Sequence, residues 1–248
     1  MIKNFINAVE FLTIFTVSRK HDVTEGDLAK SMVYFPVVGF LIGVILNYSD
    51  KALAWTVPPT IANALLLIIL VLITRALHID GLADTLDGIM GGHDRMSRLE
   101  IMKDSRLGTA GALGIVLLLL VKYLCLNNLF DNDKASALLT APMLGRWSQT
   151  LMVFKANYGR EQGMGSAFVG HLRGSGMIAT SAVALGLAIF VSGIWAAILI
   201  ASVALFTIVC RWYLVRKLGG VTGDVIGAVS ELNEALTLLL FVILSNRS

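Results

Sequence analysis

The chain has 248 residues, of which 56% are hydrophobic and only 15% are charged, and its mean hydropathy is +0.77. A soluble domain carries about 25% charged residues, and the apolar residues here form long runs, so the composition excludes a soluble globular enzyme and predicts an all-α polytopic membrane helical bundle. The net charge of +3 is too small to indicate a nucleic-acid partner, and residues 1–248 are expected to form one domain.

The N-terminal residues 1–17 are apolar but too short to span a membrane, and they lack a small-residue cleavage site. They favour an interfacial or packed helix over a signal peptide. Seven apolar runs follow that predict membrane-spanning helices. They cover about 32–48, 60–77, 108–126, 135–154, 177–191, 195–213 and 224–244.

The connections between these runs carry further information. The run 60–77 leads directly into an aspartate-rich segment, so we expect one continuous helix there. The runs 177–191 and 195–213 should form a helical hairpin that turns at Ser192-Gly193. The glycine-rich stretch 155–176 predicts a loop or a re-entrant segment. Glycine-bearing runs such as 32–48 allow helices to pack within one chain or between chains, so a homo-oligomer is compatible with the sequence.

The charges of the loops predict the orientation in the membrane. Fifteen lysines and arginines fall on one side and three on the other. The fifteen are Lys3, Arg19, Lys20, Lys30, Arg75, Arg95, Arg98, Lys103, Arg106, Lys155, Arg160, Arg173, Arg211, Arg216 and Lys217; the three are Lys51, Lys134 and Arg247. By the positive-inside rule, the N-terminus and all acidic and glycine-rich loops face the cytoplasm of the cell (inner) membrane, and the C-terminus faces outward.

The longest polar interval runs from His78 to Gly108 and reads HIDGLADTLDGIMGGHDRMSRLEIMKDSRLG. If residues 79–90 are helical, Asp80, Asp84 and Asp87 fall within an arc of about 60° on one face. Three like charges on one face repel one another and call for a cation. Clustered carboxylates at a membrane boundary favour Mg²⁺, and a zinc site is not expected because no histidine–cysteine set has zinc spacing.

The alternative for this interval is a solvated, charged loop. The aspartates share a face, adjoin a predicted span and are separated mostly by apolar residues, which favours a metal site instead.

The last predicted span contains a second set of acids. Asp224, Glu231 and Glu234 lie on one stripe of a helix, directly after the glycine-rich turn 219–223. Acids within a span are costly and usually face an interior site, and free N–H groups at a helix start bind phosphate. Asp224 is equally well placed to cap the helix.

Arg146 lies inside a predicted span, where it requires a carboxylate, a phosphate or a broken-helix carbonyl as its partner. His171 and Arg173 could meet a phosphate, but each is a weak signal, and neither His78 nor His93 receives a role. Acids for a metal, bases for anions and glycine-rich turns on one side of the membrane suit metal-assisted phosphoryl-group transfer.

At this point a family resemblance becomes visible. The segments HIDGLADTLDGIMGG and RLEIMKDSRLGTAGALG resemble the signature of the cobalamin synthase family, the adenosylcobinamide-GDP ribazoletransferases. The segments YFPVVGFLIG, APMLGRW and GGVTGDVIGAVSELNE agree with the family in the same order, so the resemblance extends over nearly the whole chain.

The resemblance implies a late step of vitamin B12 assembly. Adenosylcobinamide-GDP would be joined to α-ribazole or its 5′-phosphate with release of GMP, in a Mg²⁺-dependent attack of a ribose hydroxyl on the phosphate attached to cobinamide. We expect Asp80, Asp84 and Asp87 to bind the metal, with Asp104 or Asp87 in the catalytic role. Asp104 either completes the metal site or acts as the base, and the base is the favoured role. The substrate-binding candidates are Lys103, Arg106, Arg146 and Asp224, and Asp224 is alternatively a further metal ligand.

A cation- or proton-coupled transporter is the main alternative, since transporters also contain intramembrane acids and broken helices. No inverted repeat is visible, and the acids cluster at the predicted cytoplasmic ends. The expected partners are therefore the two substrates and membrane lipid.

Overall fold

The computed structural model describes residues 2–17, 24–160, 163 and 165–245, and within these ranges it contains helices and no β-strand. The α-helices are α1 Ile2–Leu12, α2 Glu25–Ser31, α3 Phe35–Leu53, α4 Pro59–Ile73, α5 Leu77–Gly91, α6 Arg95–Ile101, α7 Thr109–Asn127, α8 Asp131–Val153, α9 Gly174–Ser192, α10 Ala196–Leu218 and α11 Gly223–Ser245. Two short 3₁₀ helices are η1 Met32–Tyr34 and η2 Gly193–Trp195. The all-α prediction is confirmed.

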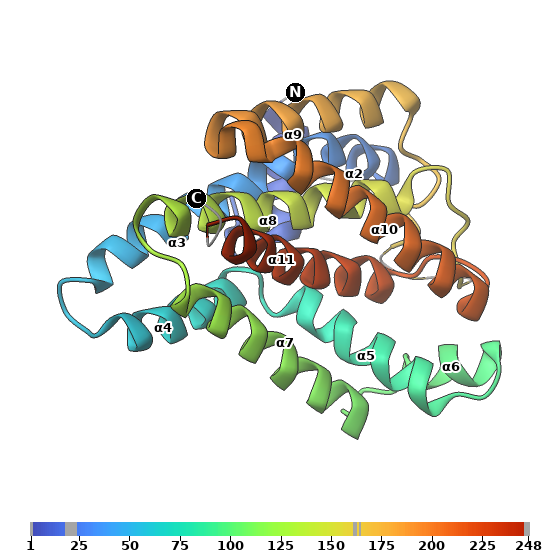
Figure 1. Cartoon of the computed structure of the whole chain (residues 1–248). Helices are drawn as coiled ribbons and strands as arrows, with labels where there is room; N and C mark the ends of the chain where they lie inside the picture. Colours follow the sequence, from blue (N-terminus) through green and yellow to red (C-terminus); the bar gives the residue numbers. More distant parts are fainter. Residues whose placement is uncertain (1, 18–23, 161–162, 164, 246–248) are drawn as a thin grey trace.

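The centre of the bundle is formed by α8 and α11, which lie side by side (Figure 1). Helix α3 packs on α8, while α5 and α7 pack on α11. Helices α9 and α10 also pack on α8. The chain turns back between α9 and α10 at Gly193, where φ is 54° (Figure 1). This turn confirms the predicted hairpin.

Glycines allow the closest approach between α3 and α8. A Cβ added at Gly43 would lie 2.6 Å from the carbonyl oxygen of Leu138, and one at Gly39 would meet the backbone at Pro142. Small residues let helix backbones pack closely in membranes, where no hydrophobic effect drives helices together. The glycines of the first predicted span therefore serve helix packing within the chain, as the sequence allowed.

Helix α4 does not continue into α5, so the expectation of one straight helix through Leu77 was wrong. The two helix axes differ in direction by 88°, and the chain turns at Thr74–Ala76. Arg75 and Ala76 both adopt positive φ, 54° and 55°, which is uncommon for residues with a side chain. The helix propensities of these residues do not predict this bend, and contacts with other parts of the chain stabilise it.

The N-terminal segment supplies that support. The Arg75 guanidinium donates to the carbonyl oxygens of Glu10 and Phe11 at 3.2 and 3.3 Å, and the backbone N–H of Ile14 donates to Ile73 at 2.7 Å. Helix α1 also contacts α2 and α3 and buries Leu12. Of the two predicted alternatives for residues 1–17, the packed helix is therefore the one observed.

A buried ion cluster joins α7, α8 and α11. The Lys122 ammonium donates to Glu231 and Glu234 at 2.6 Å each, and the Arg146 guanidinium donates to Glu234 and, at 3.3 Å, to the hydroxyl of Ser230. All four charged side chains are at most 3% exposed, and two cations balance two anions. Buried charges require such pairing.

The prediction of seven membrane spans is not confirmed as a number. Among the described residues, four segments are long and apolar enough to cross a membrane: Gly26–Leu53, Thr109–Asn127, Gly174–Leu218 and Gly223–Ser245. The bent pair α4 and α5 raises the number to five. The apolar stretch Gly174–Leu218 contains both α9 and α10, which the turn at Gly193 separates. Helix α8 is long enough but too polar, and it carries Arg146 to the bundle centre. These long apolar helices support the conclusion that the chain is a membrane protein.

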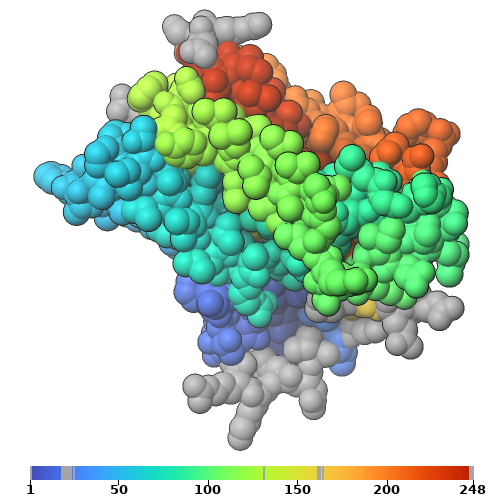
Figure 2. Space-filling view, turned by 90° about the horizontal axis from the view of Figure 1, so that it is seen from below, coloured from blue at the N-terminus to red at the C-terminus, as the bar shows by residue number. Residues whose placement is uncertain are grey.

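Helix α7 presents an apolar outer surface. Leu113, Val116, Leu117, Leu120 and Leu124 are each more than half exposed or close to it. Seen from below, α7 runs diagonally across this side of the molecule, between α4 and α6 (Figure 2). Such a surface is suited to contact with lipid. Of the residues used to predict orientation, Arg19, Lys20 and Arg247 lie outside the described residues.

We expect Gly43→Leu to lower the free energy of unfolding by at least about 1–3 kcal/mol, the usual cost of overpacking, because the added side chain meets the backbone of α8. Thermal unfolding of the protein in detergent measures this. Gly186→Leu in α9 is the matched control, since nothing lies within 4 Å of a Cβ added there. Equal melting temperatures for the two variants would contradict this packing.

We expect Lys122→Met to destabilise the protein by about 3–5 kcal/mol, because it leaves an uncompensated negative charge among buried groups. The yield of monodisperse protein extracted from membranes measures the effect. Adding Glu231→Gln restores charge balance, so the double variant should recover most of the yield. A single variant as stable as the double variant would contradict the role given to the cluster.

Candidate active site

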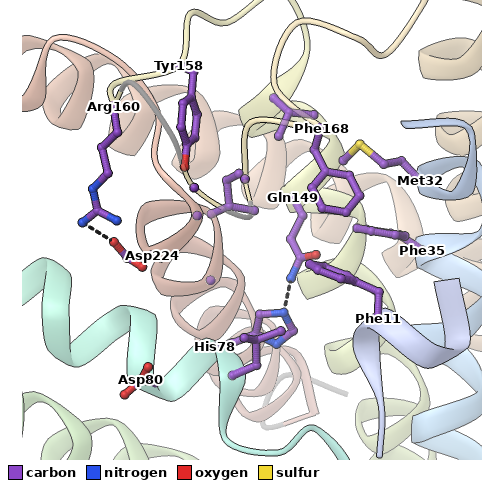
Figure 3. A pocket seen from close by; sticks show the side chains of 17 residues that line it. Phe11, Met32, Phe35, His78, Asp80, Gln149, Tyr158, Arg160, Phe168 and Asp224 are labelled. Carbon is purple, nitrogen blue, oxygen red and sulfur yellow. Dashed lines mark hydrogen bonds and ion pairs between the residues drawn. The ribbon is translucent and has the colours of Figure 1, made fainter. Parts of the chain in front are cut away.

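A cavity of about 280 Å³ lies where α1, η1, α5, α8, α11 and the loop 155–173 meet. Figure 3 shows its two chemically different ends: Asp80, Asp224 and Arg160 on one side, and aromatic rings and Met32 on the other. Its full lining is Phe11, Met32, Phe35, Leu77, His78, Asp80, Gln149, Val153, Tyr158, Arg160, Gly163, Gly165, Phe168, Gly223, Asp224, Ile226 and Gly227.

The polar end depends on the close approach of α5 and α11. A Cβ added at Gly81 would lie 2.7 Å from the backbone oxygen of Asp224, so only glycine permits this distance. Asp80 therefore faces the same cavity as Asp224, and Asp84, one turn further along α5, lies within electrostatic reach of both. The structure thus brings together the first predicted acidic set and the first acid of the last helix.

Arg160 is the cation at this end of the cavity. Its guanidinium forms an ion pair with Asp224 at 2.7 Å (Figure 3) and donates to the backbone oxygen of Met102 at 3.3 Å. Its buried Nε has no hydrogen-bond partner in the part of the chain that the structure describes. Three negative side chains and one cation leave this end acidic. A cation or an additional hydrogen-bonding ligand is therefore compatible with it.

The loop that carries Arg160 is fixed by backbone pairing. The N–H of Gly159 donates to Val221 and the N–H of Val221 donates to Asn157, each at 2.9 Å. Arg95 of α6 donates to the backbone oxygens of Gly159 and Leu218. The described residues of the predicted glycine-rich stretch 155–176 therefore form a loop up to the start of α9, and the turn 219–223 contacts this loop through Val221.

His78 and Gln149 form a buried polar pair in the cavity wall. The Nε2 atoms of the two side chains lie 2.8 Å apart, and His78 is 3% exposed (Figure 3). The remaining ring nitrogen of His78, Nδ1, has no hydrogen-bond partner among the described residues. No role was predicted for His78 from its place in the sequence, whereas the structure puts it with Asp80 in the cavity lining.

Asp87 does not line the cavity. Its two carboxylate oxygens accept hydrogen bonds from the backbone N–H groups of Gly108 and Gly111, both at 2.8 Å. These groups are free donors at the start of α7, where a negative charge is also favoured by the helix dipole. In this structure Asp87 binds the N-terminus of α7, and its assignment as a metal ligand stays a prediction.

Asp104, Lys103 and Arg106 lie in the connection between α6 and α7, and none of them lines the cavity. Arg106 and Asp104 form an exposed ion pair of 2.6 Å, and hydrogen bonds from Arg106 lower the pKa of Asp104 to about 2. A carboxyl with so low a pKa is a weak base. The geometry therefore does not favour the predicted catalytic role of Asp104.

Arg146, Glu231 and Glu234 belong to the buried ion cluster and are absent from the cavity lining. Of the three partners that the sequence left open for Arg146, a carboxylate, that of Glu234, is the one observed. The acids of α11 thus have two roles. Asp224, in the first turn of the helix, faces the cavity, while Glu231 and Glu234 pair with Lys122 and Arg146.

The donor chemistry of the polar end suits Mg²⁺, because all its acidic side chains are carboxylates. No three His, Cys, Asp or Glu side chains in the described part of the chain are grouped as a ready-made metal site. Mg²⁺ commonly uses only one or two carboxylates and completes its shell with water and substrate phosphates. Asp80 and Asp224, which line the cavity, could supply two such carboxylates, and Asp84 lies within electrostatic reach of both.

The sequence analysis missed Arg160, Gln149 and the aromatic side chains of the cavity. Arg160 was counted only as a loop charge, although its position in a glycine-rich loop beside Tyr158 was a usable signal. Phe11 and Phe168 lie far apart in the chain and carry no motif, so only the fold brings them together.

Comparison with known proteins identifies the family. The family model described as cobalamin-5-phosphate synthase matches residues 4–242. A protein of Geotalea daltonii named adenosylcobinamide-GDP ribazoletransferase is 41% identical over 100% of both chains. Proteins of the same name from a Thermoanaerobacter species and from Klebsiella pneumoniae are each 37% identical, covering 98% and 96% of this chain and 98% and 99% of their own. No solved structure matches the chain.

The matched residues include every part of the cavity lining, from Phe11 to Gly227. Two independent features therefore agree, a family model over nearly the full chain and relatives aligned over almost their entire lengths. The chain belongs to the cobalamin-5-phosphate synthase family.

Proposed function

We propose that this chain joins adenosylcobinamide-GDP to α-ribazole or its 5′-phosphate, giving adenosylcobalamin or its 5′-phosphate and GMP. The names of its relatives support the reaction. The observation that carries the proposal is the cavity, in which carboxylates and an arginine adjoin an apolar wall large enough for part of a nucleoside. A phosphate and an aromatic base are the two kinds of group that such a cavity would receive.

In the proposed reaction, a ribose hydroxyl of the acceptor forms a new bond to the phosphorus attached to cobinamide. The bond between that phosphorus and the oxygen of the GMP phosphate breaks, and GMP leaves with the bonding electrons. The hydroxyl proton passes to a carboxylate of the cavity, Asp80 or Asp224, instead of to Asp104. Holding the hydroxyl and the phosphorus in line is the main task of the protein.

Asp80, Asp84 and Asp224 are the residues that would hold Mg²⁺. A bound Mg²⁺ supplies charge neutralisation of the diphosphate. Arg160 adds a fixed positive charge beside Asp224, and its unpartnered Nε is a donor for a phosphate oxygen. Asp87 contributes indirectly, because it fixes the start of α7 against α5.

We also propose that this end of the bundle faces the cytoplasm in the inner membrane, with the C-terminus outside. The support is the concentration of lysine and arginine in the loops that surround the cavity, including Arg95, Lys155 and Arg160. The substrate nucleotides are soluble in water and would reach the cavity from that side.

We expect Asp84→Asn to abolish GMP release while leaving the amount of protein in the membrane unchanged, because it removes one negative charge from the proposed metal site. The assay follows GMP formation from adenosylcobinamide-GDP and α-ribazole with Mg²⁺ present. Asp133→Asn is the matched control, since Asp133 is an exposed residue at the other end of α8 from Gln149. Normal turnover by the Asp84 variant would overturn the metal-site proposal.

We expect Arg160→Ala to lower the rate of GMP release about 10- to 150-fold, which corresponds to loss of one charge-assisted hydrogen bond of about 1.5–3 kcal/mol. Arg106→Ala removes an exposed arginine that does not line the cavity and should change the rate little. The two variants therefore separate the cation identified in the structure from the one expected from the sequence motif. A larger loss of rate in Arg106→Ala than in Arg160→Ala would instead support Arg106, the arginine expected from the sequence, as the substrate-binding cation.

A further inference from the structure

The apolar end of the cavity is a cluster of three aromatic rings. The ring centroids of Phe11 and Phe168 lie 4.7 Å apart, those of Phe35 and Phe168 5.9 Å, and those of Phe11 and Phe35 6.0 Å. Met32 lies beside them (Figure 3). We call these four side chains the aromatic wall. They come from α1, η1, α3 and the loop 155–173, so none of the elements that carry the acids contributes to the wall.

The size of the cavity limits what the aromatic wall can contact. About 280 Å³ is just below the range of about 300–1,000 Å³ that is usual for the pockets of drug-sized ligands. A corrin macrocycle is far larger than such a ligand and has to remain outside. A planar fused ring linked to one ribose is of suitable size. Flat aromatic faces are also the surfaces on which planar bases stack.

The position of the polar groups fixes a direction. Gln149 and His78 lie between the aromatic wall and the acidic end, so the cavity changes from apolar to hydrogen-bonding to charged along its length (Figure 3). An aromatic nucleoside has the same order of properties: a planar base, a ribose with hydroxyl groups, and the site of phosphoryl transfer.

We propose that the aromatic wall is the binding site for the planar base of the acceptor nucleoside, with its ribose at His78 and Gln149 and its reacting hydroxyl toward Asp80 and Asp224. This inference rests on the proposed function, and it adds which substrate the cavity holds and in which direction. Buried His78, with an unpartnered Nδ1, supplies a hydrogen-bonding atom for the ribose.

The N-terminal helix then belongs to the substrate site. Phe11 is held in position because the carbonyl oxygens of Glu10 and Phe11 accept hydrogen bonds from Arg75 at the bend before α5. The same bend positions His78 and Asp80. Recognition of the base and alignment of the ribose are therefore linked through Arg75.

The first experiment measures binding of α-ribazole alone to the purified full-length protein by calorimetry. Phe168→Ala should raise the dissociation constant about 5- to 150-fold, the range found when one aromatic stacking platform is removed. Phe241→Ala is the matched control: Phe241 is 4% exposed and Phe168 is 3% exposed, but Phe241 does not line the cavity. The control should bind α-ribazole as the wild type does.

A second variant covers the case in which Phe168→Ala fails to fold. Phe168→Leu keeps an apolar side chain but loses the planar face. It should bind α-ribazole more weakly, and it should lose most of the wild-type preference for a benzimidazole nucleoside over the corresponding imidazole nucleoside. The KM for adenosylcobinamide-GDP should remain near the wild-type value in both variants.

Unchanged α-ribazole binding in Phe168→Leu would overturn the inference, as would a rise in KM confined to adenosylcobinamide-GDP. Neither outcome would affect the proposed function, because the wild type would still release GMP. Absence of GMP release from the wild-type protein would instead overturn the proposed function itself, so the two failures are distinguishable.

Discussion

The pairing of buried charges in the middle of the bundle is the constraint on which the arrangement depends. Lys122 and Arg146 are opposed by Glu231 and Glu234, so α7 and α8 are both tied to α11. Each charge is expensive to bury alone, and three helices must therefore assemble together. Because Asp224 lies at the start of the same α11, the cluster that stabilises the bundle also determines where the first acid of this helix meets α5.

The cavity is assembled from segments that are distant in the chain. The bend at Arg75 turns α5 across α11, the bridge between Tyr158 and Val221 holds Arg160 over Asp224, and α1 closes the apolar end. None of these elements forms the site alone. The charged groups and the aromatic wall are therefore independent parts of one cavity, joined by the fold.

Sequence reasoning predicted the helices well, because long apolar runs and an i, i+4, i+7 aspartate pattern are local properties. It did not predict the bend before α5, since two non-glycine residues with positive φ are stabilised only by contacts from α1. Asp87 was assigned to a metal because its face was visible in the sequence, whereas the helix start it binds lies 21 residues away. Arg160 and the aromatic wall likewise depend on tertiary contacts.

The division of the cavity has a consequence for how such a protein can diversify. The acids on α5 and α11 lie at one end, and the side chains of the aromatic wall come from other segments. A chain that adapts to a different base can change α1, η1 and the loop around Phe168 while its reactive end is kept. The specificity for the base and the reaction itself can therefore evolve separately. Substitutions that change which base is accepted are expected in the N-terminal helix.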